Sequence, residues 1–155
     1  MCKMYAKPVF KGQNYSDGTS YKGEALHGLR HGKGKQTFVD GSVYIGTFSR
    51  GLADGHGVLL YPDGTEYVGE FTRGKFNGIG KATLANGDSI AGHFVDAKVQ
   101  GHGIYTESTT GEKHEGVFEN GKLQPLATQS NLLDEIDGFV SEVQELIEEW
   151  RSELL

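Results

Sequence analysis

The sequence predicts an all-β repeat array: tandem β-hairpins in a single-layer, twisted antiparallel sheet, followed by one C-terminal α-helix. A Tyr-x-Gly phrase recurs every 23 residues, at Tyr21, Tyr44 and Tyr67, with altered copies at Ile90 and, one residue late, at His114. Asp-Gly or Asn-Gly pairs recur at the same step, and the end of the chain changes to a helical pattern. A fixed period of this length is typical of units that bury their apolar faces only by stacking on neighbours.

The first strand of each unit begins at the Tyr-x-Gly phrase. Two positions after its glycine stands an aromatic or apolar residue, so the tyrosine, the glycine and this residue share one side of an extended strand. The residues in this column are Ala25, Phe48, Phe71, Phe94 and Phe118.

Glycines mark the turns and the second strand of each unit. A turn carries Gly28, Gly51, Gly74 or Gly121, with Ala97 in the fourth copy. Next come pairs of glycines one residue apart: Gly32 and Gly34, Gly55 and Gly57, Gly78 and Gly80, Gly101 and Gly103. The second strand then reaches Asp40-Gly41, Asp63-Gly64 or Asn86-Gly87, for which we predict type I′ turns because such pairs tolerate positive φ at both central positions. The chain therefore reads as four to five consecutive hairpins.

The paired glycines are expected to do more than turn the chain. A glycine on the tyrosine side removes the Cβ where a ring from a neighbouring strand would lie across the backbone. The rings could then stack in rows along a twisted sheet that has no obligatory second layer. We expect a curved trough whose inner, aromatic face is partly exposed to solvent.

The C-terminal segment predicts an amphipathic helix over 132–155, capped by Ser130 or Asn131 after a connector at 123–131. Its apolar positions follow alternating steps of three and four: Leu133, Ile136, Val140, Val143, Ile147, Trp150 and Leu154. An adjacent apolar column of Leu132, Phe139 and Leu146 widens the stripe, which favours docking on a sheet, a groove or a larger bundle over a dimeric zipper. The helix could cap the exposed last hairpin. Alternatively, it could be an interaction element that pairs with another chain or lies in the trough.

Charge and composition restrict the function. The net charge of −6 resides in the helical tail, and the near-neutral repeats lack the clustered Lys and Arg that nucleic-acid binding needs. No stretch is apolar enough for a membrane span, and the single Cys2 allows no internal disulfide, so we expect a cytoplasmic protein.

The histidines do not suggest catalysis or metal binding. All six follow the repeat period in different columns and form no ligand set such as His-x-Glu-x-x-His. The Gly-x-Gly pairs lie between two strands and open no helix, unlike those of dinucleotide-binding loops. We therefore expect no enzyme activity, no cofactor and no metal.

The unit from Tyr67 to Gly80, Tyr-Val-Gly-Glu-Phe-x-x-Gly-Lys-Phe-Asn-Gly-Ile-Gly, resembles the MORN (membrane occupation and recognition nexus) repeat. The resemblance covers about residues 12–122, after an N-terminal segment at 1–11. It implies a scaffold or adaptor, often at the cytoskeleton or a membrane. Lys11-Gly12, the Tyr21 phrase and the segment 74–78 are most similar to retinophilin-like small MORN proteins, whose partner type is the tail of class III myosin.

Together these features predict a non-catalytic adaptor that binds a basic-hydrophobic peptide of a partner, such as a motor tail, in an aromatic trough with an acidic rim. The expected partner-binding residues are Phe38, Asp40, Tyr44, Phe48, Tyr61, Asp63, Glu66, Tyr67, Glu70, Phe71 and Phe94. The alternative for the aromatic residues is that their rings only hold the sheet together. The alternative function is a membrane-associated module that contacts anionic phospholipids through Lys33, Lys35, Arg50, Arg73, Lys75, Lys81 and Lys98.

Overall fold

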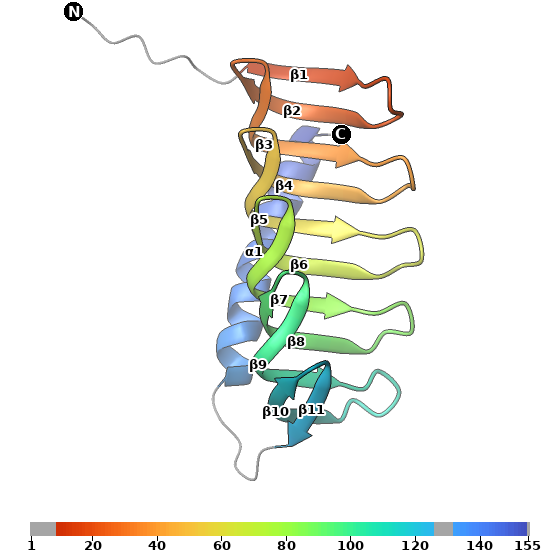
Figure 1. The fold of residues 1–155 in the computed structure, drawn as a ribbon, viewed down its shortest axis with the longest axis vertical. Helices are drawn as coiled ribbons and strands as arrows, with labels where there is room; N and C mark the ends of the chain where they lie inside the picture. The colour runs from red at the N-terminus through yellow and green to blue at the C-terminus, as the bar shows by residue number, and fades with distance from the viewer. Residues whose placement is uncertain (1–8, 126–131, 155) are drawn as a thin grey trace, which may run out of the picture.

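The computed structural model describes residues 9–125 and 132–154, which form one eleven-stranded sheet and one helix (Figure 1). Every strand pairs antiparallel with its neighbours in chain order, as predicted. The strands are β1 (Val9–Asn14), β2 (Ser20–Leu26), β3 (Leu29–Thr37), β4 (Val43–Ser49), β5 (Leu52–Leu60), β6 (Glu66–Thr72), β7 (Lys75–Thr83), β8 (Ser89–Val95), β9 (Lys98–Thr106), β10 (Lys113–Glu119) and β11 (Lys122–Pro125). The helix α1 spans Leu132–Leu154, and the predicted cap at Ser130 or Asn131 lies outside the described residues.

Two kinds of turn alternate along the array: tight turns within each hairpin, and Asp-Gly or Asn-Gly turns between hairpins. The prediction that the Asp-Gly and Asn-Gly turns are type I′ was wrong. Positive φ at two consecutive residues, which defines type I′, occurs at the tight turns His27-Gly28, Arg50-Gly51, Arg73-Gly74, Asp96-Ala97 and Asn120-Gly121. In the Asp-Gly and Asn-Gly turns only the glycine has positive φ. There Gly41 N–H donates to Phe38 O at 3.0 Å and Phe38 N–H donates to Ser42 O at 2.8 Å, which is a three-residue loop ending in a glycine bulge. The Asp40 side chain stabilises this loop by accepting the N–H of Ser42 at 2.8 Å.

The tyrosine rings lie across the glycine backbone of the neighbouring strand, as predicted. A Cβ at Gly57 would lie 2.5 Å from Cε2 and 2.6 Å from Oη of Tyr44. Tyr21 covers Gly34 and Tyr67 covers Gly80 in the same way. The Tyr44 hydroxyl donates to the backbone oxygen of Thr47 at 2.8 Å, which fixes its ring over the strand.

Four hairpins contain a bulge that bends the sheet, and its extra residues lie in their second strands, β3, β5, β7 and β9. The pairing of β4 with β5 shifts register between Gly46 and Phe48, and β2, β6 and β8 shift at the equivalent position. The tight-turn ends of the hairpins curl away from the rest of the sheet beyond this point (Figure 1). The bend brings Tyr44 edge-to-face with Phe48 and with Phe71, at centroid distances of 5.1 and 4.8 Å. The result is a buried aromatic cluster of Tyr21, Tyr44, Phe48, Tyr67, Phe71 and Phe94.

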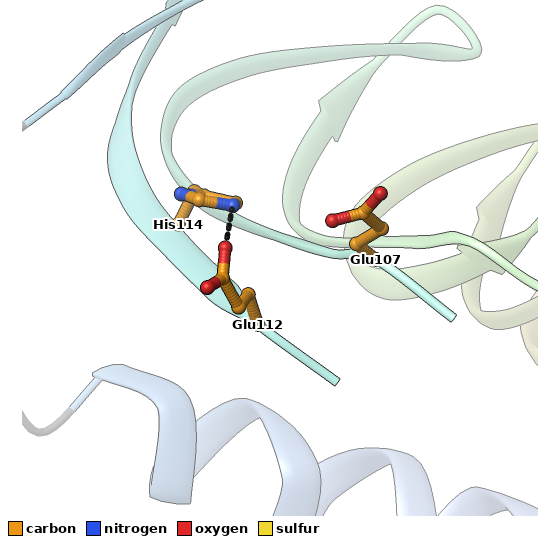
Figure 2. A group of neighbouring side chains, drawn as sticks. All are labelled: Glu107, Glu112 and His114. Atoms are coloured by element: carbon orange, nitrogen blue, oxygen red, sulfur yellow. Dashed lines mark ion pairs between the residues drawn. The ribbon is translucent and has the colours of Figure 1, made fainter. Parts of the chain in front are cut away.

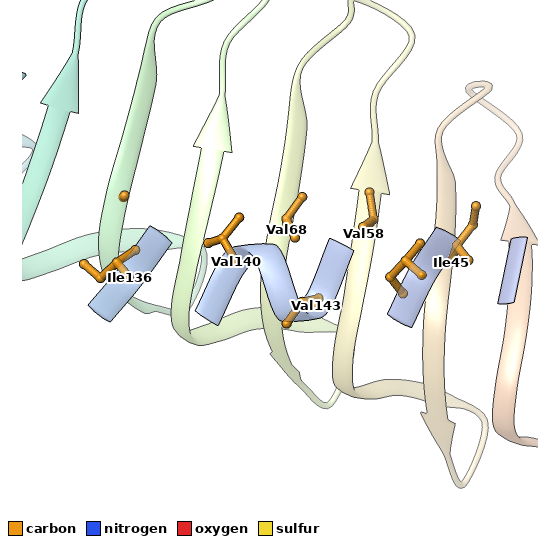
Figure 3. Close-up of a cluster of buried hydrophobic side chains, with 8 residues drawn as sticks. Ile45, Val58, Val68, Ile136, Val140 and Val143 are labelled. Atoms are coloured by element: carbon orange, nitrogen blue, oxygen red, sulfur yellow. The ribbon is translucent and has the colours of Figure 1, made fainter. Parts of the chain in front are cut away.

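The helix α1 packs on the opposite face of the sheet, mainly against β3 to β8, and runs along the long axis of the array (Figure 1). Its buried residues Ile136, Val140, Val143 and Ile147 contact a cross-strand row formed by Ile45, Val58, Val68 and Ala91 (Figure 3). Of the three docking surfaces expected for the wide stripe, a sheet, a groove or a larger bundle, the structure shows the sheet.

Both predicted locations of the helix were wrong. It crosses the middle of the array instead of capping the last hairpin, because the apolar row lies there. Beyond this row, at the β2–β3 end, the same cross-strand positions are Lys22 and Lys35. The helix also leaves the aromatic side of the sheet uncovered, since it occupies the other face.

Candidate protein-interaction surface

Four side chains form a row at one edge of the aromatic side, which we call the turn row: Tyr15, Phe38, Tyr61 and Leu84. Each opens one of the Asp-Gly or Asn-Gly turns and repeats the same backbone hydrogen bond, such as Tyr61 N–H to Thr65 O at 2.8 Å. Tyr61 and Leu84 are each 37% exposed, whereas Tyr15 and Phe38 are half-buried against the aromatic cluster. The turn row is therefore an accessible apolar border of an otherwise buried core.

Carboxylates accompany the turn row. Asp40 and Asp63 are exposed, and they accept hydrogen bonds from the backbone N–H groups of Ser42 and Thr65, respectively. These hydrogen bonds hold the pKa of each carboxyl below its ordinary value. Burial raises the pKa of Tyr61, and the negative charges of Asp40 and then Asp63 raise it further. Both charges therefore lie close enough to act on the Tyr61 phenol, so this edge combines an aromatic surface with negative potential.

The structure divides the predicted partner-binding residues into an accessible and a buried group. Phe38, Asp40, Tyr61 and Asp63 lie together at the turn row. The aromatic residues of the first strands are only 1–4% exposed and contact one another: Tyr44, Phe48, Tyr67, Phe71 and Phe94. These five rings hold the sheet together beneath the surface, so the prediction that they line a solvent-exposed trough was wrong.

Glu66 and Glu70 do not border the aromatic side. Glu66 precedes Tyr67 on β6 and so points to the opposite face, where it lines a groove with Gln144 and Arg151 of α1. Glu70 lies opposite the bulge of β7, and its Oε2 accepts the N–H of Ile79 in that bulge at 2.6 Å. The expected acidic rim therefore consists of turn aspartates instead of these two glutamates.

Basic residues gather at the other edge of the sheet, around the tight turns. The exposed residues of this basic edge are Arg50, Arg73, Lys75, Lys98 and Lys122. The remaining lysines of the membrane hypothesis lie elsewhere. Lys33 places its Nζ 5.8 Å from the ring centroid of Trp150. Lys35 stands at one end of the apolar row, beside Ile45, and Lys81 interrupts the row between Val68 and Ala91. The exposed basic residues thus lie at the edge opposite the turn aspartates.

One grouping of potential metal ligands occurs among the described residues, at the β9–β10 turn (Figure 2). Ligand atoms of Glu107, Glu112 and His114 lie within 4.8 Å of one another, and His114 Nε2 is 3.7 Å from a Glu112 oxygen. Sequence reasoning examined the histidines alone and missed this proximity, which the two glutamates flanking a turn could have suggested. Glu107 already accepts hydrogen bonds from the hydroxyls of Thr109 and Thr110, so turn contacts account for its position.

The helix in the described part of the chain is not long and apolar enough to cross a membrane. The structure as a whole defines an open, single-layer array of β-hairpins with a helix docked along one face. The model of the MORN repeat matches three consecutive segments, residues 21–43, 44–66 and 67–89, so this part of the chain consists of MORN repeats. The repeat itself is a non-enzymatic module.

A comparison with curated proteins finds no match. Among solved structures, the chain is similar to the TCP domain of SAS-4 (dCPAP) from Drosophila melanogaster, solved in complex with a proline-rich motif of Ana2 (dSTIL). The sequences are 12% identical, the match covers 83% of this chain and 99% of that chain, and the TM-score is 0.32. A structural similarity this low supports no inference about function.

Proposed function

We propose that this protein is a non-catalytic adaptor that binds a basic-hydrophobic peptide of a partner protein along the turn row. The observation that carries the proposal is the pairing of exposed Tyr61 and Leu84 with the carboxylates of Asp40 and Asp63 at one edge. Aromatic anchors beside a charged rim are typical of protein interfaces. The resemblance to retinophilin-like proteins suggests the tail of a cytoskeletal motor such as class III myosin as partner, and hence a cytoplasmic location at the cytoskeleton.

The test uses a fluorescent tail peptide of class III myosin and anisotropy titrations of the full chain. Asp63→Asn removes one negative charge but keeps the turn, because Asn86 accepts the N–H of Asp88 in the same way in the next repeat. Rim charges contribute about 0.5–1 kcal/mol, so we expect each of Asp40→Asn and Asp63→Asn to raise Kd by about two- to fivefold. Raising the salt concentration should reduce the difference between these variants and the wild type.

Glu66→Gln is the matched control, because it removes the same charge from the same repeat on the helix face. It should leave the affinity within twofold of the wild type. Equal loss for Glu66→Gln and Asp63→Asn, or no loss for either, would contradict binding at the turn row.

A second candidate function is contact with anionic phospholipids, which the exposed Arg50, Arg73, Lys75 and Lys98 of the basic edge favour. The acidic outer side of α1 opposes it. Co-sedimentation with phosphatidylcholine vesicles, with and without phosphatidylserine, distinguishes the two. Lipid binding that needs phosphatidylserine and is lost in Arg50→Gln/Arg73→Gln supports the membrane function, whereas equal sedimentation in both vesicle types counts against it.

A further inference from the structure

We infer that the peptide bound at the turn row is a polyproline II segment with an apolar residue at every third position and Lys or Arg between them. This inference rests on the proposed function and adds the conformation and sequence class of the ligand. Three features of the turn row support this inference: the spacing of its side chains, their chemical type, and the position at which the row of apolar side chains ends.

The turn row has a fixed spacing. Each of its residues is separated from the next by two hydrogen-bonded strands, and adjacent strands lie about 4.8 Å apart, so the step is about 9.6 Å. The hydrogen bond that closes each turn is nearly constant, at 2.8 Å for Tyr15, Phe38 and Tyr61 and 2.7 Å for Leu84. The hairpins stack one above another along the long axis (Figure 1), so equivalent side chains form a line.

Polyproline II matches this step most closely. It rises about 3.1 Å per residue with three residues per turn, so every third side chain returns to the same side after about 9.3 Å. An α-helix returns to the same side after seven residues, or about 10.5 Å, and a β-strand after two, or about 6.8 Å. Over the three steps from Tyr15 to Leu84 the mismatch is about 1 Å for polyproline II and about 3 Å for a helix.

The chemistry of the row agrees with the spacing. Three of its four members are aromatic, and aromatic surfaces are what proline-rich polyproline II ligands dock against. A polyproline II backbone makes no internal hydrogen bonds, so its carbonyls are free to accept one from the exposed Tyr61 hydroxyl. Asp17, Asp40 and Asp63 recur at the same step and favour a basic residue in each triplet.

The row also has an end. In the fifth turn the position equivalent to Tyr61 and Leu84 is Glu107, whose N–H donates to Glu112 O at 2.9 Å. An acid replaces the apolar side chain there, so the apolar register covers four turns. The matching ligand is therefore about twelve residues long.

The experiment compares three labelled peptides of equal length and equal positive charge against the full chain. The first is (Pro-Pro-Lys) repeated four times, the second has the same composition with the lysines clustered at one end, and the third is an amphipathic helix with Leu and Lys in heptad spacing. We expect the triplet peptide to bind at least fivefold more tightly than the other two. Tyr61→Ala should weaken it about tenfold, whereas Leu52→Ala, which removes a 49% exposed side chain at the tight-turn edge, should not.

The outcomes separate the inference from the proposed function. If the helical peptide binds most tightly and depends on Tyr61, polyproline II recognition is refuted while peptide binding at the turn row stands. If clustering the lysines costs nothing, the placement of Lys or Arg between the apolar positions is refuted. If none of the peptides nor the motor-tail peptide shows dependence on Tyr61, both are refuted. Far-UV circular dichroism of both variants verifies that the exposed substitutions leave the sheet folded.

Discussion

Replacing Gly57 by alanine tests whether the glycine pairs exist to seat the tyrosine rings. Gly57 has an ordinary strand backbone, so alanine introduces no conformational strain of its own. Its Cβ would meet Cε2, Oη and Cζ of Tyr44 at 2.5, 2.6 and 2.7 Å. Tyr44 is 1% exposed and packs against Phe48 and Phe71, so its ring has no free space to move into.

The expected cost follows from two effects. Overpacking a core by one methyl group costs about 1–3 kcal/mol. A displaced ring also weakens the bond from the Tyr44 hydroxyl to Thr47 O, which contributes about 0.5–1.5 kcal/mol. We therefore expect Gly57→Ala to destabilise the protein by about 2–4 kcal/mol.

Urea denaturation measures this change by circular dichroism for the sheet and by Trp150 fluorescence for the docked helix, since the chain has a single tryptophan. Gly138→Ala is the control: its Cβ meets nothing within 4 Å, and a helical glycine replaced by alanine should stabilise by about 1 kcal/mol. Tyr44→Ala combined with Gly57→Ala should cost at least about 1 kcal/mol less than the sum of the two single changes, because the clash disappears with the ring. Additive costs, or a Gly57→Ala protein within 0.5 kcal/mol of the wild type, would refute the reasoning.

Three further predictions concern the helix, a tight turn and the aspartates. Ile147→Ala should destabilise the protein by about 2–4 kcal/mol, because Ile147 is buried against the sheet. Leu146→Ala is the control, since Leu146 is exposed, and it should change stability by less than about 0.5 kcal/mol. Similar urea midpoints for the two variants would contradict the docking of the helix on the sheet. Ala97→Gly should stabilise by about 1 kcal/mol, since Ala97 has φ of 68° where the other tight turns have glycine, and a lower thermal midpoint would disprove this. The pKa values of Asp40 and Asp63 are lowered by folding, so their stabilisation is present above their unfolded pKa and is lost as pH falls through the folded values. Thermal melts between pH 7 and pH 2 should show this loss, Asp63→Asn should reduce its slope, and an unchanged slope would count against the turn hydrogen bonds.

The repeat array could be predicted from the sequence because each unit carries several independent signals for a β-hairpin. The 23-residue step, the aromatic column and the glycine opposite each tyrosine all point to one repeated hairpin, and Gly57 beneath Tyr44 shows that the packing was deduced correctly. The turn types were assigned wrongly because Asp-Gly supports more than one loop. The Asp40 carboxylate favours the three-residue loop, and arginine at Arg50 gives no sign of the positive φ that it adopts.

The position of the helix was missed although the sequence carries a signal for it. The middle residue of each Tyr-x-Gly phrase points away from the tyrosine side, and it is apolar at Ile45, Val68 and Ala91. An apolar column on the second face requires a cover, and only the C-terminal helix has a matching stripe. The misplacement of Glu70 was avoidable, because Glu70 stands three residues after Tyr67 and simple alternation along β6 puts it on the opposite face. The extra residues of the bulge lie in β7, so they do not disturb the alternation of β6.

The helix that lies across β3 to β8 also affects the mechanics of the molecule. A ribbon of hairpins joined only to nearest neighbours bends at each junction. Here the single 23-residue helix α1 packs along six consecutive strands. Bending the sheet out of its plane must therefore strain the interface between the helix and these strands. The helix therefore stiffens the sheet, and the spacing between successive hairpins should stay constant when the molecule is under load.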